Sequence, residues 1–201
     1  MVTAGHHAAD ADSFRHTPAL EYRIDRHDRI IAVNDAYIAD ISAHDPTCAD
    51  AVAHVHTALI GRVLWDVLPQ AAEWYRPLVH LARTESRSVA FAFRCDTPTL
   101  RRLMEMRIVP CEDGAVRFVS TLIGQQPRDA VRLLIDGVPR GTALVRMCSW
   151  CKRVKAHADW LEVESALSRL GVSEAQPMPA VTHGICDSCR TGLTQMVTTP
   201  G

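Results

Sequence analysis

Two Cys-x-x-Cys pairs near the end of this chain constrain it more than any other feature. Cys148 and Cys151 form the first pair and Cys186 and Cys189 the second, with 34 residues between them. Each pair can turn two thiolates toward one point, and two such pairs complete the tetrahedral site that zinc prefers. His183 precedes Cys186 by three residues, where it can support a coordinated thiolate or replace one thiol as a ligand. We therefore expect a structural zinc site.

Other uses of the cysteines need weighing. Disulfides suit secreted proteins, but residues 1–7 show no charged-then-apolar signal peptide. A thioredoxin-like redox pair would need a βαβ unit, and the pattern indicates none around either pair. Four cysteines can also bind a mononuclear iron. The total of seven cysteines is odd, and Cys48, Cys95 and Cys111 have no close partner in sequence, which favours a reducing cytoplasm.

Composition argues against two classes of partner, membranes and nucleic acids. The 201 residues are 47% hydrophobic, and 22 basic against 23 acidic residues give a net charge of −1, which is typical of one or two small soluble domains. No apolar run approaches the length of a membrane span. Residues 148–201 carry five positive and five negative side chains. Because duplex nucleic acid normally requires a basic face, nucleic-acid binding is disfavoured.

Hydrophobic periodicity divides the chain into an α+β domain and a smaller cysteine-rich part. We expect a disordered tail over 1–17, strands at 20–25, 30–33, 89–94, 102–109 and 115–123, and helices starting at Asn34–Asp35 and covering 48–60 and 72–87. Two strands, several helices and three further strands fit a five-stranded antiparallel sheet with helices on one face.

The cysteine-rich part follows a predicted linker over 126–146. We expect a metal-binding module over 147–193 and a frayed tail over 194–201. Five apolar residues of the module fall on one predicted helical face that ends at Gly171: Trp160, Val163, Ala166, Leu167 and Leu170. The module is too small to bury a sufficient core alone, so a metal would stabilise it.

Both parts resemble known signalling domains. The runs Tyr22-x-Ile-Asp, Ile31-x-Val-Asn-x-Ala, Gly61-Arg-x-Leu-Trp, Phe93-Arg-Cys-Asp and Glu112-Asp-Gly resemble a PAS sensory domain over about residues 18–125. Cys148-Ser-Trp-Cys-Lys, Trp160 and His183-Gly-Ile-Cys look like a cysteine-rich module attached to PAS and other bacterial signalling domains, in which a tryptophan-containing helix follows the first pair. Asp187-Ser188 departs from the proline usual after the third cysteine. The resemblance implies a homodimer.

The sequence contains no sign of catalysis. It lacks a Gly-x-Ser-x-Gly motif, a phosphate-binding glycine loop and His-Glu-x-x-His, so we expect no enzyme. The cysteine motif of light-sensing flavin domains is absent. Haem is disfavoured, with His80 as the candidate axial ligand. The candidates to line a ligand cavity, which could equally form the core, are Trp65, Trp74, Tyr75, His80, Phe91, Phe93, Met104 and Met106.

The leading hypothesis is a cytoplasmic, non-enzymatic signalling protein. Its PAS-like domain would bind a small ligand or a signalling partner, and a structural zinc module would follow. Two alternatives remain open: a transcriptional regulator whose module binds DNA, and a thiol redox switch in which oxidation ejects the metal and pairs the cysteines.

Overall fold

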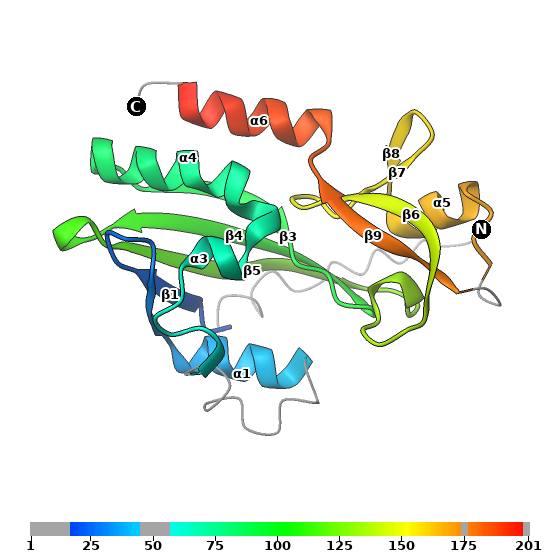
Figure 1. The fold of residues 1–201 in the computed structure, drawn as a ribbon, viewed down its shortest axis with the longest axis horizontal. Coiled ribbons are helices and arrows are strands. Elements are labelled where there is room, and N and C mark those ends of the chain that lie inside the picture. The colour runs from blue at the N-terminus through cyan, green and yellow to red at the C-terminus, as the bar shows by residue number, and fades with distance from the viewer. Residues whose placement is uncertain (1–16, 45–56, 174–176, 199–201) are drawn as a thin grey trace, which may run out of the picture.

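The computed structural model describes residues 17–44, 57–173 and 177–198, whose larger unit is a five-stranded antiparallel sheet (Figure 1). Its strands are β1 (Leu20–Ile24), β2 (Ile30–Val33), β3 (Val89–Arg94), β4 (Leu100–Pro110) and β5 (Val116–Pro127). They lie in the order β2-β1-β5-β4-β3, and each neighbouring pair is antiparallel. This confirms the predicted sheet.

Local signals explain why the strands begin and end where they do. Residues of β4 alternate between buried and more exposed positions from Arg102 to Ile108, which is the two-residue period of a strand with one covered face. The predicted turn before β5 is a short 3₁₀ helix, η2 (Glu112–Gly114), in which Asp113 and Gly114 have φ of 56° and 73°. Glycine adopts this left-handed conformation without a Cβ penalty.

Helices α1 (Asp35–His44), α3 (Leu64–Val67) and α4 (Pro69–Glu85) cover the buried face of the sheet. The side chain of Asn34 accepts a hydrogen bond from the amide of Tyr37 at 2.9 Å, so Asn34 is the predicted N-cap of α1. Helix α4 buries Leu78 and Ala82 against the sheet and starts at Pro69, three residues before the predicted position. Proline suits a first helical turn because its missing N–H would have no intrahelical partner.

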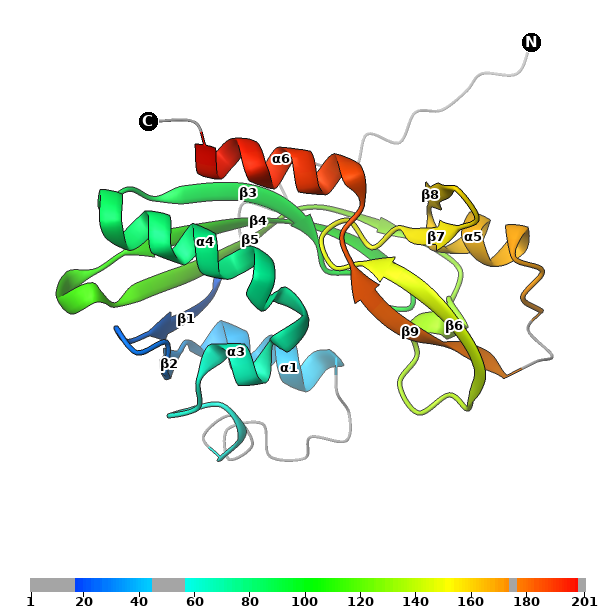
Figure 2. The same cartoon turned by 45° about the horizontal axis from the view of Figure 1, so that its top comes forward.

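A second, four-stranded sheet lies beyond the end of the first (Figure 2). Strands β6 (Arg140–Cys148), β7 (Val154–Ala156), β8 (Asp159–Leu161) and β9 (Met178–Gly184) lie in the order β8-β7-β6-β9. Strands β6 and β9 are parallel, whereas β7 pairs antiparallel with β6 and with β8. Helix α5 (Val163–Arg169) packs on this sheet, and α6 (Asp187–Thr198) lies beside α4 (Figure 1).

This second sheet corrects several predictions. The segment 126–146, predicted as a linker, contains the end of β5, a 3₁₀ helix η3 (Arg132–Leu134) and most of β6. Trp160 lies in β8 and not on the predicted helix, because the helix starts only at Val163. The chain also leaves β6 and returns in parallel through α5 to β9, so a β–helix–β crossover starts at the first cysteine pair and ends just before the second, contrary to the sequence-based expectation.

The second sheet also has a hydrophobic core of its own. Val154, Ala156, Val163 and Ala166 are fully buried there, together with Val131, Leu133, Val145, Met147 and Met178. Three of these residues, Val131, Leu133 and Val145, lie in the segment predicted as a linker, so this core extends beyond the predicted module 147–193.

Two predicted segments fall mainly outside the described residues. They are the tail over 1–17 and the helix over 48–60, which includes Cys48. At the other end α6 continues to Thr198, so residues 194–198 are helical where a frayed tail was predicted. None of the helices in the described ranges is both long and apolar enough to cross a membrane.

Candidate functional site

The first cysteine pair occupies a tight turn after β6. Cys148 ends the strand, and its amide donates to the carbonyl of Arg153 at 2.8 Å. The carbonyl of Cys148 accepts from the amide of Lys152 at 3.0 Å, and Lys152 has a φ of 60°. These bonds close the four-residue loop and turn both sulfur atoms to one side.

The second pair stands where β9 passes into α6. Because β9 is parallel to β6 and in register with it, Gly184 lies opposite Cys148, and its carbonyl accepts from the amide of Ser149 at 2.8 Å. Cys186 immediately precedes α6 and Cys189 lies in its first turn. The N-terminal end of a helix favours thiolates there. Parallel pairing therefore brings together two motifs that are far apart in the sequence.

The four sulfur atoms fit a tetrahedral metal site. The Sγ atoms of Cys148, Cys151, Cys186 and Cys189 all lie within 4.8 Å of one another, which confirms that the two pairs converge. The Sγ atoms of Cys151 and Cys186 are 3.7 Å apart. A tetrahedron with Zn–S bonds of about 2.3 Å separates its sulfurs by about 3.8 Å, whereas a disulfide requires about 2.05 Å.

The pKa values of the four thiols indicate what a bound cation would do in this cluster. The thiol of Cys151 and the backbone amides of Trp150, Cys151 and Cys186 donate toward the sulfur of Cys148 and, despite its burial, lower the pKa of Cys148 to about 4. The same hydrogen bond to Cys148, together with burial, raises the pKa of Cys151 far above that of an ordinary thiol. Burial and the neighbouring cysteines raise the pKa of Cys189 to about 12. A divalent metal removes this mutual repulsion and allows all four to bind as thiolates.

His183 does not join the cluster of sulfur atoms. It lies on β9 opposite Met147 and is partly exposed, and among the described residues the cluster with ligand atoms within 4.8 Å of one another consists of the four cysteines. Burial and the neighbouring Lys152 lower the pKa of its imidazole. The arrangement therefore favours four thiolate ligands over three thiolates and a histidine.

Trp150 ties the cysteine loop to the first sheet. Its ring centroid lies 4.4 Å from that of Phe91 and 5.4 Å from that of Tyr75. Its indole nitrogen donates to the carbonyl of Ala92 at 2.8 Å, and its carbonyl accepts from the amide of Arg94 at 2.8 Å. The loop thus covers part of β3, the edge strand of the sheet, and shares its core.

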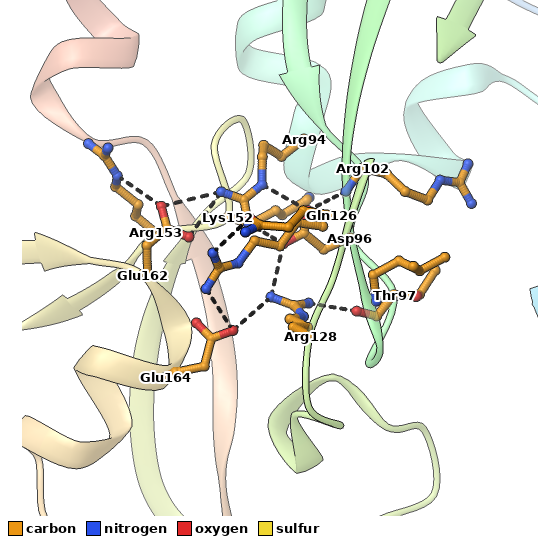
Figure 3. Close-up of polar contacts among 12 residues, drawn as sticks. Arg94, Asp96, Thr97, Arg102, Gln126, Arg128, Lys152, Arg153, Glu162 and Glu164 are labelled. Carbon is orange, nitrogen blue, oxygen red and sulfur yellow. Dashed lines mark hydrogen bonds and ion pairs between the residues drawn. The ribbon is translucent and has the colours of Figure 1, made fainter. Parts of the chain in front are cut away.

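A group of ion pairs strengthens the same junction (Figure 3). Asp96, whose side chain is only 1% exposed, pairs with Arg94 of β3 and with Arg128, which directly follows β5. Arg94 also reaches Glu162 at 3.0 Å, and Arg128 reaches Glu164 at 3.4 Å. Both glutamates belong to the cysteine-rich part of the chain, which contains the second sheet. A buried carboxylate with two guanidinium partners is satisfied, whereas an unpaired one would be costly.

A cavity of about 410 Å³ lies between the first sheet, α1, α4 and the cysteine loop. This is a common size for a small-molecule site. Five of the predicted residues line it: Trp74, Tyr75, Phe93, Met104 and Met106. Four further lining residues come from the cysteine-containing part: Ser149, Trp150, Lys152 and His183.

Three of the predicted residues do not line this cavity. Trp65 is buried and donates its indole N–H to Asp28, with the guanidinium of Arg76 5.1 Å from the ring centroid. Phe91 is buried against Trp150. His80 is exposed because the buried stripe of α4 consists of its neighbours, so it is not placed to ligate a haem in this cavity.

Sequence reasoning missed the contribution of the cysteine loop to the cavity. The motif Cys148-Ser-Trp-Cys-Lys152 marks these residues as part of a metal loop, but no local pattern shows that Trp150 packs on a sheet assembled from residues 20–127. The available signal was Trp150 itself. A short metal-binding loop has no core of its own, so a large apolar residue within it must pack against another part of the protein.

The fold and the site define an α+β domain, a five-stranded antiparallel sheet with helices on one face, followed by a second sheet that carries a four-cysteine cluster. No family model matches the chain, and no curated protein matches it. Among solved structures, a sensory box sensor histidine kinase from Vibrio cholerae is 12% identical over 58% of this chain and 90% of its own, with a TM-score of 0.39. A domain of an HTR-like protein from Haloarcula marismortui ATCC 43049 is 17% identical over 53% of this chain and 99% of its own, with a TM-score of 0.36. The sequence identities and TM-scores are low, so the fold assignment rests on the strand order and register of this chain.

Proposed function

We propose that this chain is a non-enzymatic signal-transduction protein. Its PAS-like domain binds a small ligand in the 410 Å³ cavity, and a structural zinc module, which forms part of the cavity wall, responds to that binding. The observation that carries the proposal is the shared wall: Trp150 and Lys152, which flank Cys151, line the same cavity as Tyr75 and Met106 of the PAS-like domain. A ligand in that cavity would contact both parts at once.

The zinc ion would have a structural role in this proposal. Cys148, Cys151, Cys186 and Cys189 would hold it, and four thiolates leave no open position for a catalytic water. The metal would supply a fixed link between the end of β6 and the start of α6. It would thereby hold one wall of the cavity in place.

Metal content and colour are the first test. We expect one zinc per chain by elemental analysis of protein purified without a His-tag, and no absorbance in the visible range. A protein without metal would overturn the zinc module. Visible absorbance typical of haem or flavin would show that the protein holds a bound cofactor in place of the proposed ligand.

A pair of variants tests the cavity itself. The neutral dye N-phenyl-1-naphthylamine should bind with saturable fluorescence, and Ala71→Trp should abolish that binding because Ala71 lines the cavity. Ala90→Trp is the matched control, since Ala90 is exposed on β3 and does not line the cavity. Equal binding by both variants would contradict a ligand site in this cavity.

A further inference from the structure

All three tyrosines of the chain line one cavity, which has a volume of about 410 Å³. Tyr22 belongs to β1, Tyr37 to α1 and Tyr75 to α4, so three elements that are distant in sequence bring them together. The ring centroids of Tyr22 and Tyr37 are 5.9 Å apart in an edge-to-face arrangement. The ring of Phe118 stacks on that of Tyr22 at 4.5 Å and lies 6.5 Å from that of Tyr75. One aromatic wall therefore carries three phenolic hydroxyls.

These hydroxyls have no hydrogen-bond partner within the described part of the chain. None of the three oxygens is among the fully enclosed side-chain atoms that lack a partner, so each is open to the cavity or to solvent. Tyr22 is only 8% exposed, so a partner for its hydroxyl has to enter through the cavity that it lines. A buried tyrosine usually has such a partner, and phenylalanine would fill the same space without the polar group. Packing alone therefore does not explain the three hydroxyls.

The three hydroxyls stay protonated at neutral pH. Burial, followed by the neighbouring Tyr75 and Tyr37, raises the pKa of Tyr22 well above that of an ordinary phenol. Burial also raises the pKa of Tyr37, with a smaller contribution from Asp40, and the pKa of Tyr75, with a smaller contribution from Cys95. A protonated phenol can donate one hydrogen bond. The cavity wall thus offers neutral donors without acceptors.

The charged side chains of the cavity wall already have opposite charges beside them. Arg94 pairs with Asp96, and Asp40 pairs with Arg102 at 3.1 Å. Lys152 follows the first cysteine pair, and four thiolates around a divalent cation would leave a net negative charge near its ammonium. A charged ligand would therefore lose its hydration without gaining an unpaired opposite charge.

We infer that the cavity binds a neutral, planar aromatic molecule with a carbonyl group, whose oxygen accepts hydrogen bonds from the tyrosine hydroxyls. Aromatic side chains stack on planar groups, and six of them line the cavity: Tyr22, Tyr37, Trp74, Tyr75, Phe93 and Trp150. A hydrocarbon would leave the hydroxyls without a partner. This inference rests on the proposed function and adds the chemical class of the ligand.

Two probes of matched shape test the inference. 2-Acetylnaphthalene carries a carbonyl group, and 2-ethylnaphthalene has a methylene group at the same position. Displacement of N-phenyl-1-naphthylamine from the zinc-loaded full chain measures the affinity of each. We expect the ketone to bind about fivefold more tightly, although it is the less hydrophobic of the two. The anion 2-naphthoate should bind more weakly than the ketone, and tighter binding of this anion would overturn the neutral class.

Removal of the hydroxyls should abolish the preference for the ketone. In a variant that combines Tyr22→Phe, Tyr37→Phe and Tyr75→Phe, we expect the ketone and the hydrocarbon to bind equally. The melting temperature should not fall, because no described residue loses a hydrogen bond. A folded variant that keeps the wild-type preference would refute the role of the tyrosines.

A second measurement needs no variant. The infrared carbonyl band of isotopically labelled 2-acetylnaphthalene should lie at lower wavenumber when the ketone is bound than in a hydrocarbon solvent, because a donated hydrogen bond weakens the C=O bond. A band at the hydrocarbon position, or equal affinity of the wild-type protein for the two probes, would overturn the carbonyl ligand but retain the ligand cavity. Failure of Ala71→Trp to reduce binding of N-phenyl-1-naphthylamine would remove the proposed function as well.

Discussion

Replacing Trp150 tests whether the cysteine-containing part and the first sheet form one cooperative unit. Trp150 is 7% exposed and belongs to the same hydrophobic core as Phe91. Truncating a buried tryptophan to alanine costs about 3–5 kcal/mol, and the lost bond from its indole nitrogen to Ala92 belongs to that loss. We expect Trp150→Ala to lower the free energy of unfolding by about 4 kcal/mol. Domains have about 5–15 kcal/mol in total, so about a quarter to four fifths of the stability would be lost.

Urea unfolding followed by far-ultraviolet circular dichroism measures this loss, and a colorimetric chelator reports zinc release in the same samples. In the wild type both signals should change in a single transition. Trp160→Ala is the matched control, because Trp160 is half-buried on β8, with the Lys155 ammonium 5.5 Å from its ring centroid. It should cost about 2 kcal/mol or less. A smaller loss for Trp150→Ala than for Trp160→Ala would refute the reasoning.

Three further predictions concern the metal centre and the junction. Cys189→Ser should lose zinc and melt at a lower temperature, whereas Cys111→Ser, half-buried and outside the cluster, should keep one zinc per chain by elemental analysis. Burial raises the pKa of Glu164, but a backbone hydrogen bond and the guanidinium groups of Arg101 and Arg128 outweigh it and lower that pKa below 4.5. The ionised carboxylate therefore adds stability above about pH 4.5 that is lost as the pH falls through the lowered pKa. Glu164→Gln should reduce the acid dependence of the free energy of unfolding, measured by urea titration, by about 1 kcal/mol or less. Peroxide should release zinc and lower the melting temperature if the cysteines act as a redox switch; unchanged metal content and stability would exclude the switch.

The first sheet was predictable because its signals are local. Alternation of buried and exposed residues marks β4, and the polar turn Glu112–Gly114 separates it from β5. The N-cap at Asn34 was likewise visible in the sequence. Each of these depends on residues close together in the chain, so periodicity and turn chemistry were sufficient to find them.

The second sheet was missed because its decisive pairing is not local. Strand β6 shows little alternation, since Thr142, Ala143 and Leu144 are all exposed. Its parallel partner β9 lies beyond a hairpin and a helix. Spacing located the four cysteines correctly, because Cys-x-x-Cys geometry is set within each loop, but it could not show what surrounds them.

The position of the four cysteines changes the structural role that we expect for the metal. The sequence suggested that zinc would replace a missing core, yet the second sheet has its own core around Val154 and Val163. Cys148 and Cys186 belong instead to the core of the first sheet, together with Trp150. The metal would therefore fix the loop after β6 and the start of α6 against that sheet. That loop carries Trp150 and Lys152, so the same four thiolates would set the position of one wall of the cavity.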